Sequence, residues 1–556
     1  MNDAQITGGK WWLPGTEQYR VKLAVRSESA ITDIRIYDGP VLLRRFRPGV
    51  PPLAGGDSGG ASFTFDLPHD QQRNLVAEIT DANGKRAITG GLFIRSWLNW
   101  RFMCGDRGNS ICDAIQVDEA GAYMTGPTAP YQRKMTAFGV CAGYGERHFN
   151  ILPPDFDGGM RPVGMHVQPW FQIPDYTCAP PSSTLESRME VPLCSRDGLM
   201  QDNTIVGYFP GKSDYHAWGP KVAPKDIDGV RVRYRYLDIT ARAHDPGVLL
   251  LEGSLHFDRA MKLNHLSLFN VFHTSEQGEG DHFALVTPET TVSGMVAGEP
   301  FGAGGRMGPG SYACVFPSLW GSTGIIALDD GSRAEVYSQP PSNHIGVSLV
   351  DVPREIKAGE ELRYRYVLMH GRAGEGPNTS EWEQFAVRMG LRGKPAYEVK
   401  DVKLGNVTGT KFLLELEPAE GGFAGAVTHA DLPIRLPVRV SSMNPNWTFA
   451  WFDLDRKEWY PSAIDRETRT GFFTLDTRRG AHRLFAGHPV LADNPDVHIS
   501  VLSDGKSEIR ADLNNVTDKP MTLTIRLNPA LGTSAPQQME LASGEMRTVK
   551  FAYSAN

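Results

Sequence analysis

The chain has 556 residues, with 57 Lys and Arg against 64 Asp and Glu, and a formal net charge of -7 at pH 7. A charge this small excludes a general nucleic-acid binder, which needs a concentrated basic surface, but it allows a local arginine cluster for an anionic sugar. No run of about 18 apolar residues occurs, so the sequence predicts no membrane span. The length exceeds one ordinary core, and roughly two to four domains are expected.

The N-terminus and the cysteines leave the cellular compartment open. The first residues, MNDAQITGGKWW, show no basic segment followed by an apolar one. The chain is therefore either cytoplasmic or a form whose leader was removed, and a periplasmic or secreted location is favoured. Five of the six cysteines lie between 104 and 194 without a CxxC pair, which excludes the usual zinc and redox spacings. Disulfides and reduced thiols both fit that spacing.

Short strands separated by turns predict an all-β fold, in keeping with 59 Gly, 39 Pro and few helix-periodic stretches. Residues 1–97 are expected to form an immunoglobulin-like β-sandwich. The turn signals there include Asn83-Gly84. The strand-like runs read YRVKLAVRS, TDIRIYDG, SFTFDLP, NLVAEITD and AITGGLFIRS.

Residues 98–392 are expected to form a large, loop-rich central β-sandwich, which is the candidate catalytic domain. From 98 to 228, polar and aromatic residues crowd irregular segments of the kind that usually carry function. Strong strands return from 229 to 376, and the word RYRY occurs at both 233–236 and 363–366. Alternation along a strand would place the tyrosines on one face and the arginines on the other. The repeat is either a trace of internal symmetry or a coincidence.

One helix is predicted, at SEWEQFAVRMGL. Ser380 can cap it, Glu383 fits a capping box and Gly390 can end it. Its apolar face comprises Trp382, Phe385, Ala386 and Met389. Residues 393–556 return to alternating strands and predict a C-terminal β-sandwich. The expected fold is thus a large central sandwich flanked by a smaller one on each side.

The sequence holds no GxGxxG, GxxxxGK, HExxH or GxSxG motif, which argues against most nucleotide-dependent and metalloprotease functions. GAGG at 302–305 is interpreted as a glycine loop without functional weight. Function must therefore be sought in clusters of polar residues, beginning with YGERHFN at 144–150. There Arg147 and Asn150 could clamp a carboxylate, and His148 could transfer a proton near neutral pH. The alternative is a surface turn whose charges pair locally.

A second cluster is SDYHAW at 213–218. Tyr215 and His216 could act as acid and base if a loop displays both, and Trp218 could stack on a sugar ring. On a regular strand the first two would belong to opposite faces. A packed loop with a half-buried aromatic side chain is the alternative.

Two further groups are weaker. In 264–282, His265 and His273 would share a face of an unbroken strand, and His282 follows a turn; one His with turn carboxylates could hold a divalent metal. No other cofactor is expected, and the metal ligands are unknown. A glycosidase instead needs two carboxylates about 5–10 Å apart. The candidates in or beside irregular segments are Asp106, Glu146, Asp155, Asp157, Glu252, Glu276 and Glu279.

The region 98–392, strand-rich with aromatic and Arg/His-bearing loops, resembles the sandwich domains of carbohydrate-active proteins. These include the galactose-mutarotase-like supersandwich found in polysaccharide lyases and some glycosidases. The resemblance concerns architecture and loop chemistry in about half of the chain, and it rests on no diagnostic motif. It departs from the usual lyase plan because no helical toroid precedes the sandwich.

The resemblance implies an enzyme that cleaves glycosidic bonds in a polysaccharide or oligosaccharide, and β-elimination on a uronic-acid chain is narrowly favoured. Arg147 and Asn150 would form the clamp, His148 or His216 the base and Tyr215 the acid. A glycoside hydrolase using Glu146 with Asp155 or Asp157 is the competing hypothesis. A non-catalytic sugar-binding or surface protein is another. Sheet edges leave a homo-oligomer open.

Overall fold

The computed structural model describes backbone in ranges along most of the chain, but between residues 93 and 247 it describes strands only and no side chains. The described ranges are 9–12, 18–47, 60–68, 73–95, 102–104, 112–114, 138–143, 146–151, 163–166, 170–173, 176–178, 188–194, 201–208, 230–238, 247–263, 265–274, 282–295, 302–316, 323–339, 342–370, 380–392, 394, 396–409, 413–429, 434–466, 468–475 and 480–553. Within them the protein is all-β apart from one α-helix and a short 3-10 segment, which confirms the predicted class. No helix of this described part is long and apolar enough to cross a membrane.

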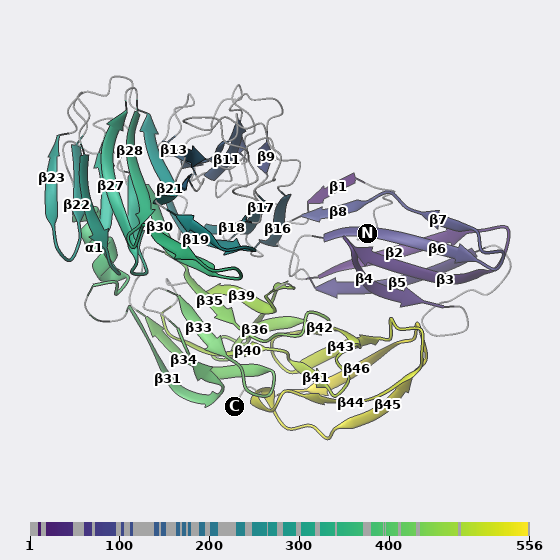
Figure 1. Ribbon diagram of the computed structural model, residues 1–556. Helices are drawn as coiled ribbons and strands as arrows, with labels where there is room; N and C mark the ends of the chain where they lie inside the picture. The colour runs from purple at the N-terminus through teal and green to yellow at the C-terminus, as the bar shows by residue number, and fades with distance from the viewer. Residues whose placement is uncertain are drawn as a thin grey trace.

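The first unit, here called the N-terminal sandwich, lies at the right of Figure 1. Its strands are β1 (Gly9–Trp12), β2 (Gln18–Arg26), β3 (Ile31–Asp38), β4 (Val41–Phe46), β5 (Gly60–Pro68), β6 (Arg73–Asp81), β7 (Arg86–Ile88) and β8 (Leu92–Arg95). Every second residue of β6 is buried, as the alternating pattern requires. The predicted Asn83-Gly84 turn is confirmed, since Gly84 has φ +75° and its N–H donates to the Asp81 carbonyl at 3.0 Å.

Two large sheets follow, each with nine strands in the described residues. Sheet A contains β11 (Phe138–Gly143), β12 (Glu146–Ile151), β13 (Val163–His166), β14 (Trp170–Ile173), β15 (Tyr176–Cys178), β21 (His265–Thr274), β24 (Gly302–Met307), β27 (Ser332–Gln339) and β28 (Ser342–Leu349). Sheet B contains β16 (Arg188–Cys194), β17 (Gln201–Tyr208), β18 (Val230–Asp238), β19 (Gly247–Phe257), β22 (His282–Val286), β23 (Thr291–Met295), β25 (Tyr312–Phe316), β26 (Thr323–Ala327) and β30 (Glu361–His370). The sheets pack face to face. The buried Tyr364 hydroxyl of sheet B, for example, donates to the Leu268 carbonyl of sheet A at 3.4 Å.

Two small ladders accompany these sheets. They pair β9 (Phe102–Cys104) with β10 (Cys112–Ala114), and β20 (Met261–Leu263) with β29 (Arg354–Ile356). The first makes Cys104 and Cys112 Cα partners across an antiparallel pair. Positions paired in this way lie within disulfide reach, which leaves both a bridge and reduced thiols open, as the sequence did.

The two strands that carry the RYRY repeat lie on either side of one strand. β18 and β30 both pair with β19, and the register places Tyr234 and Tyr364 opposite Gly253. A Cβ on Gly253 would collide with the Tyr364 ring, so glycine makes room for the buried tyrosine between the sheets. In the second word the tyrosines are buried and Arg363 is exposed, as predicted. The repeat therefore corresponds to two equivalent positions in sheet B.

Helix α1 (Ser380–Arg388) covers the outer face of sheet B. Its predicted apolar face is confirmed, and Trp382 is fully buried 6.3 Å from the Tyr312 ring. Gly390 ends it with φ +65°. Glu383 accepts from Arg392 at 2.7 Å. The same apolar cluster includes residues beyond 396, so α1 joins the central sheets to the next unit.

Residues 397–487 form the third unit, built from two five-stranded sheets in the described residues. Its strands are β31 (Tyr397–Leu404), β32 (Asn406–Val407), β33 (Leu414–Glu417), β34 (Gly422–His429), β35 (Leu436–Val440), β36 (Phe449–Asp453), β37 (Glu458–Ser462), β38 (Ile464–Asp465), β39 (Thr470–Leu475) and β40 (His482–Gly487).

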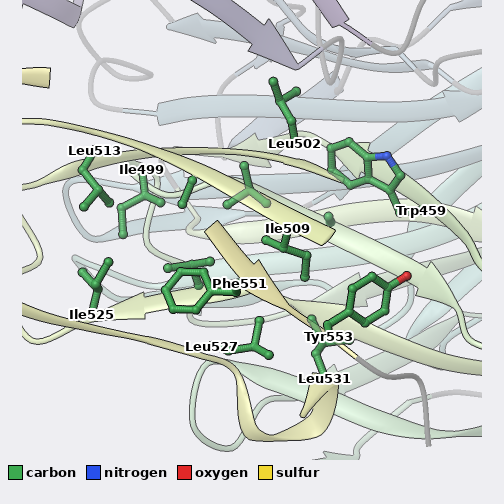
Figure 2. Packing of buried hydrophobic residues seen from close by; sticks show 14 of the residues in the cluster. Trp459, Ile499, Leu502, Ile509, Leu513, Ile525, Leu527, Leu531, Phe551 and Tyr553 are labelled. Atoms are coloured by element: carbon green, nitrogen blue, oxygen red, sulfur yellow. The ribbon is translucent and has the colours of Figure 1, made fainter. Parts of the chain in front are cut away.

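Residues 490–553 form the C-terminal sandwich. Its elements are β41 (Val490–Ala492), β42 (His498–Ser503), β43 (Glu508–Asn514), β44 (Met521–Leu527), η3 (Pro529–Leu531), β45 (Gln537–Leu541) and β46 (Met546–Ala552). Figure 2 shows its core, where Ile509 and Phe551 pack among aliphatic side chains together with Trp459 of the third unit. Neighbouring units thus share apolar clusters. The domain boundaries at residues 97 and 392 stay predictions, and so does the immunoglobulin-like character of the first unit.

Two sequence expectations are corrected. GAGG at 302–305 lies in strand β24, where a Cβ on Gly304 would stand 2.5 Å from the Arg333 guanidinium. The glycines thus suit a crowded strand and not a loop. Strand β21 is not unbroken, since its register shifts between Ser267 and Phe269. The expectation that His265 and His273 share one face required an unbroken strand and fails for that reason.

Candidate functional site on sheet A

Histidine and asparagine residues occupy two neighbouring rows in sheet A, where a row is a series of Cα-paired positions on successive strands. The first row runs through the Cα partners Cys141, His148, His166, Asn270, Gly346, Glu335 and Gly304. The second, two positions along each strand, runs through Gly139, Asn150, Gly164, Phe272, His344, Tyr337 and Gly302. We call these positions the polar rows.

Sheet spacing fixes how close these positions lie. Directly paired Cα atoms are about 5 Å apart, neighbouring strands about 4.8 Å and alternate residues about 7 Å. The His148 and His166 positions are therefore adjacent, and those of Asn150 and Asn270 lie within roughly 10 Å of both. Two imidazole-bearing positions and two amide-bearing positions thus meet on three successive strands.

The described end of the rows shows which face they occupy. Val336 and Ile345, at intervening positions, are 0% and 1% exposed and belong to the core between the two sheets. Glu335, the neighbour of Val336 along the strand and the partner of Gly346, is exposed. Because successive positions of a strand alternate between faces, the polar rows belong to the face of sheet A turned away from sheet B.

Tyr337 is the tyrosine of this face whose side chain is described. Burial, with a smaller contribution from the Glu335 carboxylate, raises its pKa to about 12. The phenol therefore keeps its proton at neutral pH and can donate it. Its Cα partner on β28 is His344, so a base-bearing and an acid-bearing position face each other here as well.

The sequence-predicted residues fall in two places. Arg147, His148 and Asn150 lie on β12, their side chains outside the described part of the chain. Consecutive positions of a strand belong to opposite faces, so Arg147 occupies the face opposite His148 while Asn150 shares that of His148. The second cluster, Tyr215, His216 and Trp218, lies outside the described residues.

Sequence analysis missed four positions of the polar rows: His166, Asn270, His344 and Tyr337. They come from four strands up to about 190 residues from β12, and only the strand order brings them together. The available signal was local, a glycine two positions before or after a polar residue, as in Gly164 and His166. Such spacing is common in strands and identifies no site by itself.

Glu252 is the carboxylate from the predicted set whose side chain is described. It forms an ion pair with Arg439 of β35, and the same guanidinium lies 3.7 Å from Glu415. Arg365, on the strand beside it, holds Asp329 by two hydrogen bonds of 2.6 and 2.9 Å. Arginine pairs therefore engage both acids, and the Glu252–Arg439 pair joins sheet B to the third unit.

A buried Asp–His pair also occurs in the third unit. His482 Nδ1 lies 3.0 Å from Asp453 Oδ2, and Arg456 donates to the same carboxylate at 2.5 Å. Burial alone would raise the pKa of Asp453, but the hydrogen bonds from His482 and Arg456 outweigh it and lower that pKa. Both side chains are 0% exposed, so the pair stabilises the fold and is not positioned to meet a substrate.

A cleft of about 440 Å³ lies between the third unit and the C-terminal sandwich. Its charged lining residues are Asp401, Lys403, Glu420 and Arg483. Arg483 pairs with Asp455 at 3.0 Å, and Glu420 with Arg526 at 3.1 Å. No aromatic side chain occurs among the lining residues that the structure describes, so this cleft offers no stacking surface for a sugar.

No group of three or more His, Cys, Asp or Glu among the described side chains could hold a metal ion. Most of the segment 273–282 lies outside that part of the chain, so a divalent cation there stays a prediction. Cys314 is free and buried, and burial raises the pKa of its thiol well above the usual value. It is therefore a packing residue and no nucleophile.

No protein-family model and no curated protein matches the sequence. Among solved structures, the chain is similar to a GH36 α-galactosidase from Geobacillus stearothermophilus, with TM-score 0.27 and 9% identity over 44% of this chain. It spans only 41% of that protein's length.

Two further solved structures name related classes. A galactose mutarotase related enzyme from Lactobacillus acidophilus has TM-score 0.26 and 8% identity, covering 45% of this chain and 99% of its own. A Paenibacillus xanthan lyase has TM-score 0.25 and 10% identity, covering 77% of this chain and 49% of its own. These are the classes that the sequence resemblance named, but TM-scores this low carry no argument for the activity.

Proposed function

We propose that this protein is a carbohydrate-active enzyme that cleaves glycosidic bonds in an acidic polysaccharide or its oligosaccharides by β-elimination. The reaction would take place on the face of sheet A that carries the polar rows. The observation that carries the proposal is the strand register, which pairs His148 with His166 and brings Asn150 and Asn270 beside them. Elimination needs this combination of a base and hydrogen-bond donors.

In the proposed reaction a base removes the proton next to the sugar carboxyl group. The electron pair of that C–H bond forms a carbon–carbon double bond, the glycosidic C–O bond breaks, and the leaving oxygen takes up a proton. His148 is the proposed base, because an imidazole is neutral and accepting near pH 7. The amides of Asn150 and Asn270 would donate to the carboxylate, whose charge grows as the proton leaves.

Distance excludes Tyr337 as the acid that protonates the leaving oxygen. Tyr337 lies four strands from Asn150 in the second row, about 19 Å at the usual strand spacing. That is too far for one glycosidic bond to meet both His148 and Tyr337. The proposal therefore keeps Tyr215 as the acid, His216 as the alternative base and Trp218 as a stacking surface; all three lie outside the described residues. Arg147, on the other face of β12, is left as a second-choice clamp.

The face of sheet A also suits a chain-like substrate in shape. The two rows also include five glycines, which are Gly139, Gly164, Gly302, Gly304 and Gly346. A glycine in a strand leaves its face open for close approach of another chain. Gly304 does not add to this space, because the Arg333 guanidinium lies against it. Rows of positions that cross seven strands suit an extended polymer better than a single small sugar.

The test is a panel of acidic and neutral polysaccharides read by two signals in parallel. Elimination yields an unsaturated uronide, which absorbs in the ultraviolet, together with new reducing ends. We expect both signals to rise together on an acidic glycan. Reducing ends without absorbance would instead identify a hydrolase with Glu146 and Asp155 or Asp157, and silence on both would favour a non-catalytic sugar-binding protein.

A further inference from the structure

A small cavity lies where the N-terminal sandwich, the third unit and the C-terminal sandwich meet. Its volume is about 50 Å³. A single water needs about 10–15 Å³ of such space, so the cavity has room for one small ion or a few waters. Its walls come from β4 and the start of β6, from the segments 445–449 and 462–466, and from β42.

The lining of this cavity is cationic. Arg44, Arg73 and Arg466 contribute three guanidinium groups, and no carboxylate occurs among the lining residues that the structure describes. The Ser500 hydroxyl also lies on the wall, whereas the Thr448 hydroxyl already donates to the Ile499 carbonyl at 3.2 Å. A guanidinium and a hydroxyl both donate hydrogen bonds, so the cavity offers donors to a ligand that accepts them.

Arg44 is buried deeply, with 1% of its surface exposed. Its guanidinium donates to the carbonyl of the preceding residue, Leu43, at 2.9 Å and to the Ser500 hydroxyl of β42. Arg73 also pairs with Asp38 at 2.8 Å. Burying a guanidinium group costs free energy that an anion in the cavity would offset.

The pKa of His498, another lining residue, reflects the positive charge around the cavity. Burial, with added repulsion from Arg44 and Arg466, lowers its pKa to about 3. The imidazole is therefore neutral at physiological pH. The two arginines that repel its proton come from different units, which shows that their positive charges converge on the same place.

We propose that this cavity binds one free tetrahedral oxyanion, phosphate or sulfate, held by Arg44, Arg73 and Arg466 where the three units join. The planar fork of arginine matches the edge of such an ion, and several forks can bind different oxygen atoms. The small volume favours the free ion over a larger ester. Bound there, the anion would also fasten the N-terminal sandwich to the two units that follow α1.

The test is calorimetric titration of the intact protein with sodium phosphate and with sodium sulfate, at ionic strength held constant with chloride. We expect saturable binding of one ion per chain. Arg466→Gln should weaken it by at least about tenfold, since one charge-assisted contact is lost. Arg466 is exposed at the mouth of the cavity, so this variant is expected to fold, and its thermal unfolding in chloride verifies that.

The control is Arg469→Gln, which removes the same charge three residues away. Arg469 donates to the Met443 carbonyl at 3.2 Å and does not line the cavity, so phosphate binding should persist. Glucose 6-phosphate separates the free ion from an ester and should bind much more weakly. No saturable binding of either oxyanion, equal losses in the two variants, or equal binding of the ester would overturn the proposal.

Discussion

Two histidines of the C-terminal half, His488 and His498, are buried, and the hydrogen bonds of His488 fit only the neutral imidazole. His488 Nε2 accepts from the Asn444 backbone N–H at 2.8 Å, while Nδ1 donates to the Thr448 carbonyl at 3.0 Å. A protonated ring would turn both nitrogens into donors and lose the first bond. Burial accordingly lowers the pKa of His488 to about 4, as it lowers that of His498 to about 3.

These depressed values predict an acid sensitivity with a defined window. The unfolded chain takes up the two protons below its ordinary histidine pKa of 6.5, whereas the folded protein does not until about 4 and 3. Acid therefore favours the unfolded chain, and stability is lost as the pH falls from 6.5 toward those values. Between pH 7 and 5 each histidine should cost about 2 kcal/mol. Urea unfolding at the two pH values measures this.

His488→Gln should lose about 2 kcal/mol less than the unchanged protein over the same interval. His256→Gln, at a partly exposed histidine of β19, controls for loss of an imidazole as such. If His488→Gln and the unchanged protein lose stability equally between pH 7 and 5, His488 is not neutral in the folded state.

At the scale of elements, sequence patterns predicted which segments form strands better than they predicted how those strands pair. The runs LPVRVSS, TFAWFDLD and MTLTIRLN are strands β35, β36 and β44, because alternation and turn residues are local properties. Strand pairing is not local. Strand β13 follows β12 closely along the chain, but no local pattern sets the register that pairs His166 with His148. Strand β21 lies more than 100 residues beyond β12, so Asn270 could not be predicted as a neighbour either. The bulge in β21 was hidden for the same reason.

Helix α1 was predictable because its signals are local and consistent. Its removal from packing should be costly, since Trp382 is fully buried between sheet B and the third unit. We expect Trp382→Ala to lower the free energy of unfolding by about 3–5 kcal/mol. Val387→Ala, on the same helix at an exposed position, should change it by less than about 0.5 kcal/mol. Denaturant unfolding measures both, and similar values for the two would contradict the placement of α1.

At the scale of the whole molecule, the first unit packs against the last. Asn514 of β43 accepts from the Arg45 backbone N–H at 3.0 Å and donates to the Arg45 carbonyl at 3.1 Å. Arg45 also binds Asp518 at 2.6 Å, and Arg510 binds Asp66 at 2.9 Å. Residues more than 400 positions apart thus hold the N-terminal sandwich beside the C-terminal sandwich (Figure 1).

Asn514→Ala should loosen this junction. It leaves the buried Arg45 backbone groups without their amide partner, at an expected cost of about 2–4 kcal/mol. Hydrogen exchange of β4 should speed up, while that of the third unit's core strand β36 stays slow. Lys550→Ala, which removes an exposed pair with Glu508, is the control and should cost at most about 1 kcal/mol. Unchanged exchange in β4 would show that the Asn514 contact does not hold the two sandwiches together.

The central claim is that the polar rows of sheet A carry out β-elimination with His148 as the base. The most direct measurement compares the unchanged protein with His148→Gln, Tyr337→Phe and His256→Gln on the best acidic glycan, by ultraviolet absorbance of the product at pH 7. His148→Gln should lower the rate by about 100-fold or more, as loss of a general base does, while Tyr337→Phe and the control His256→Gln stay within about twofold. A His148→Gln variant that forms the unsaturated product at the full rate would contradict the claim.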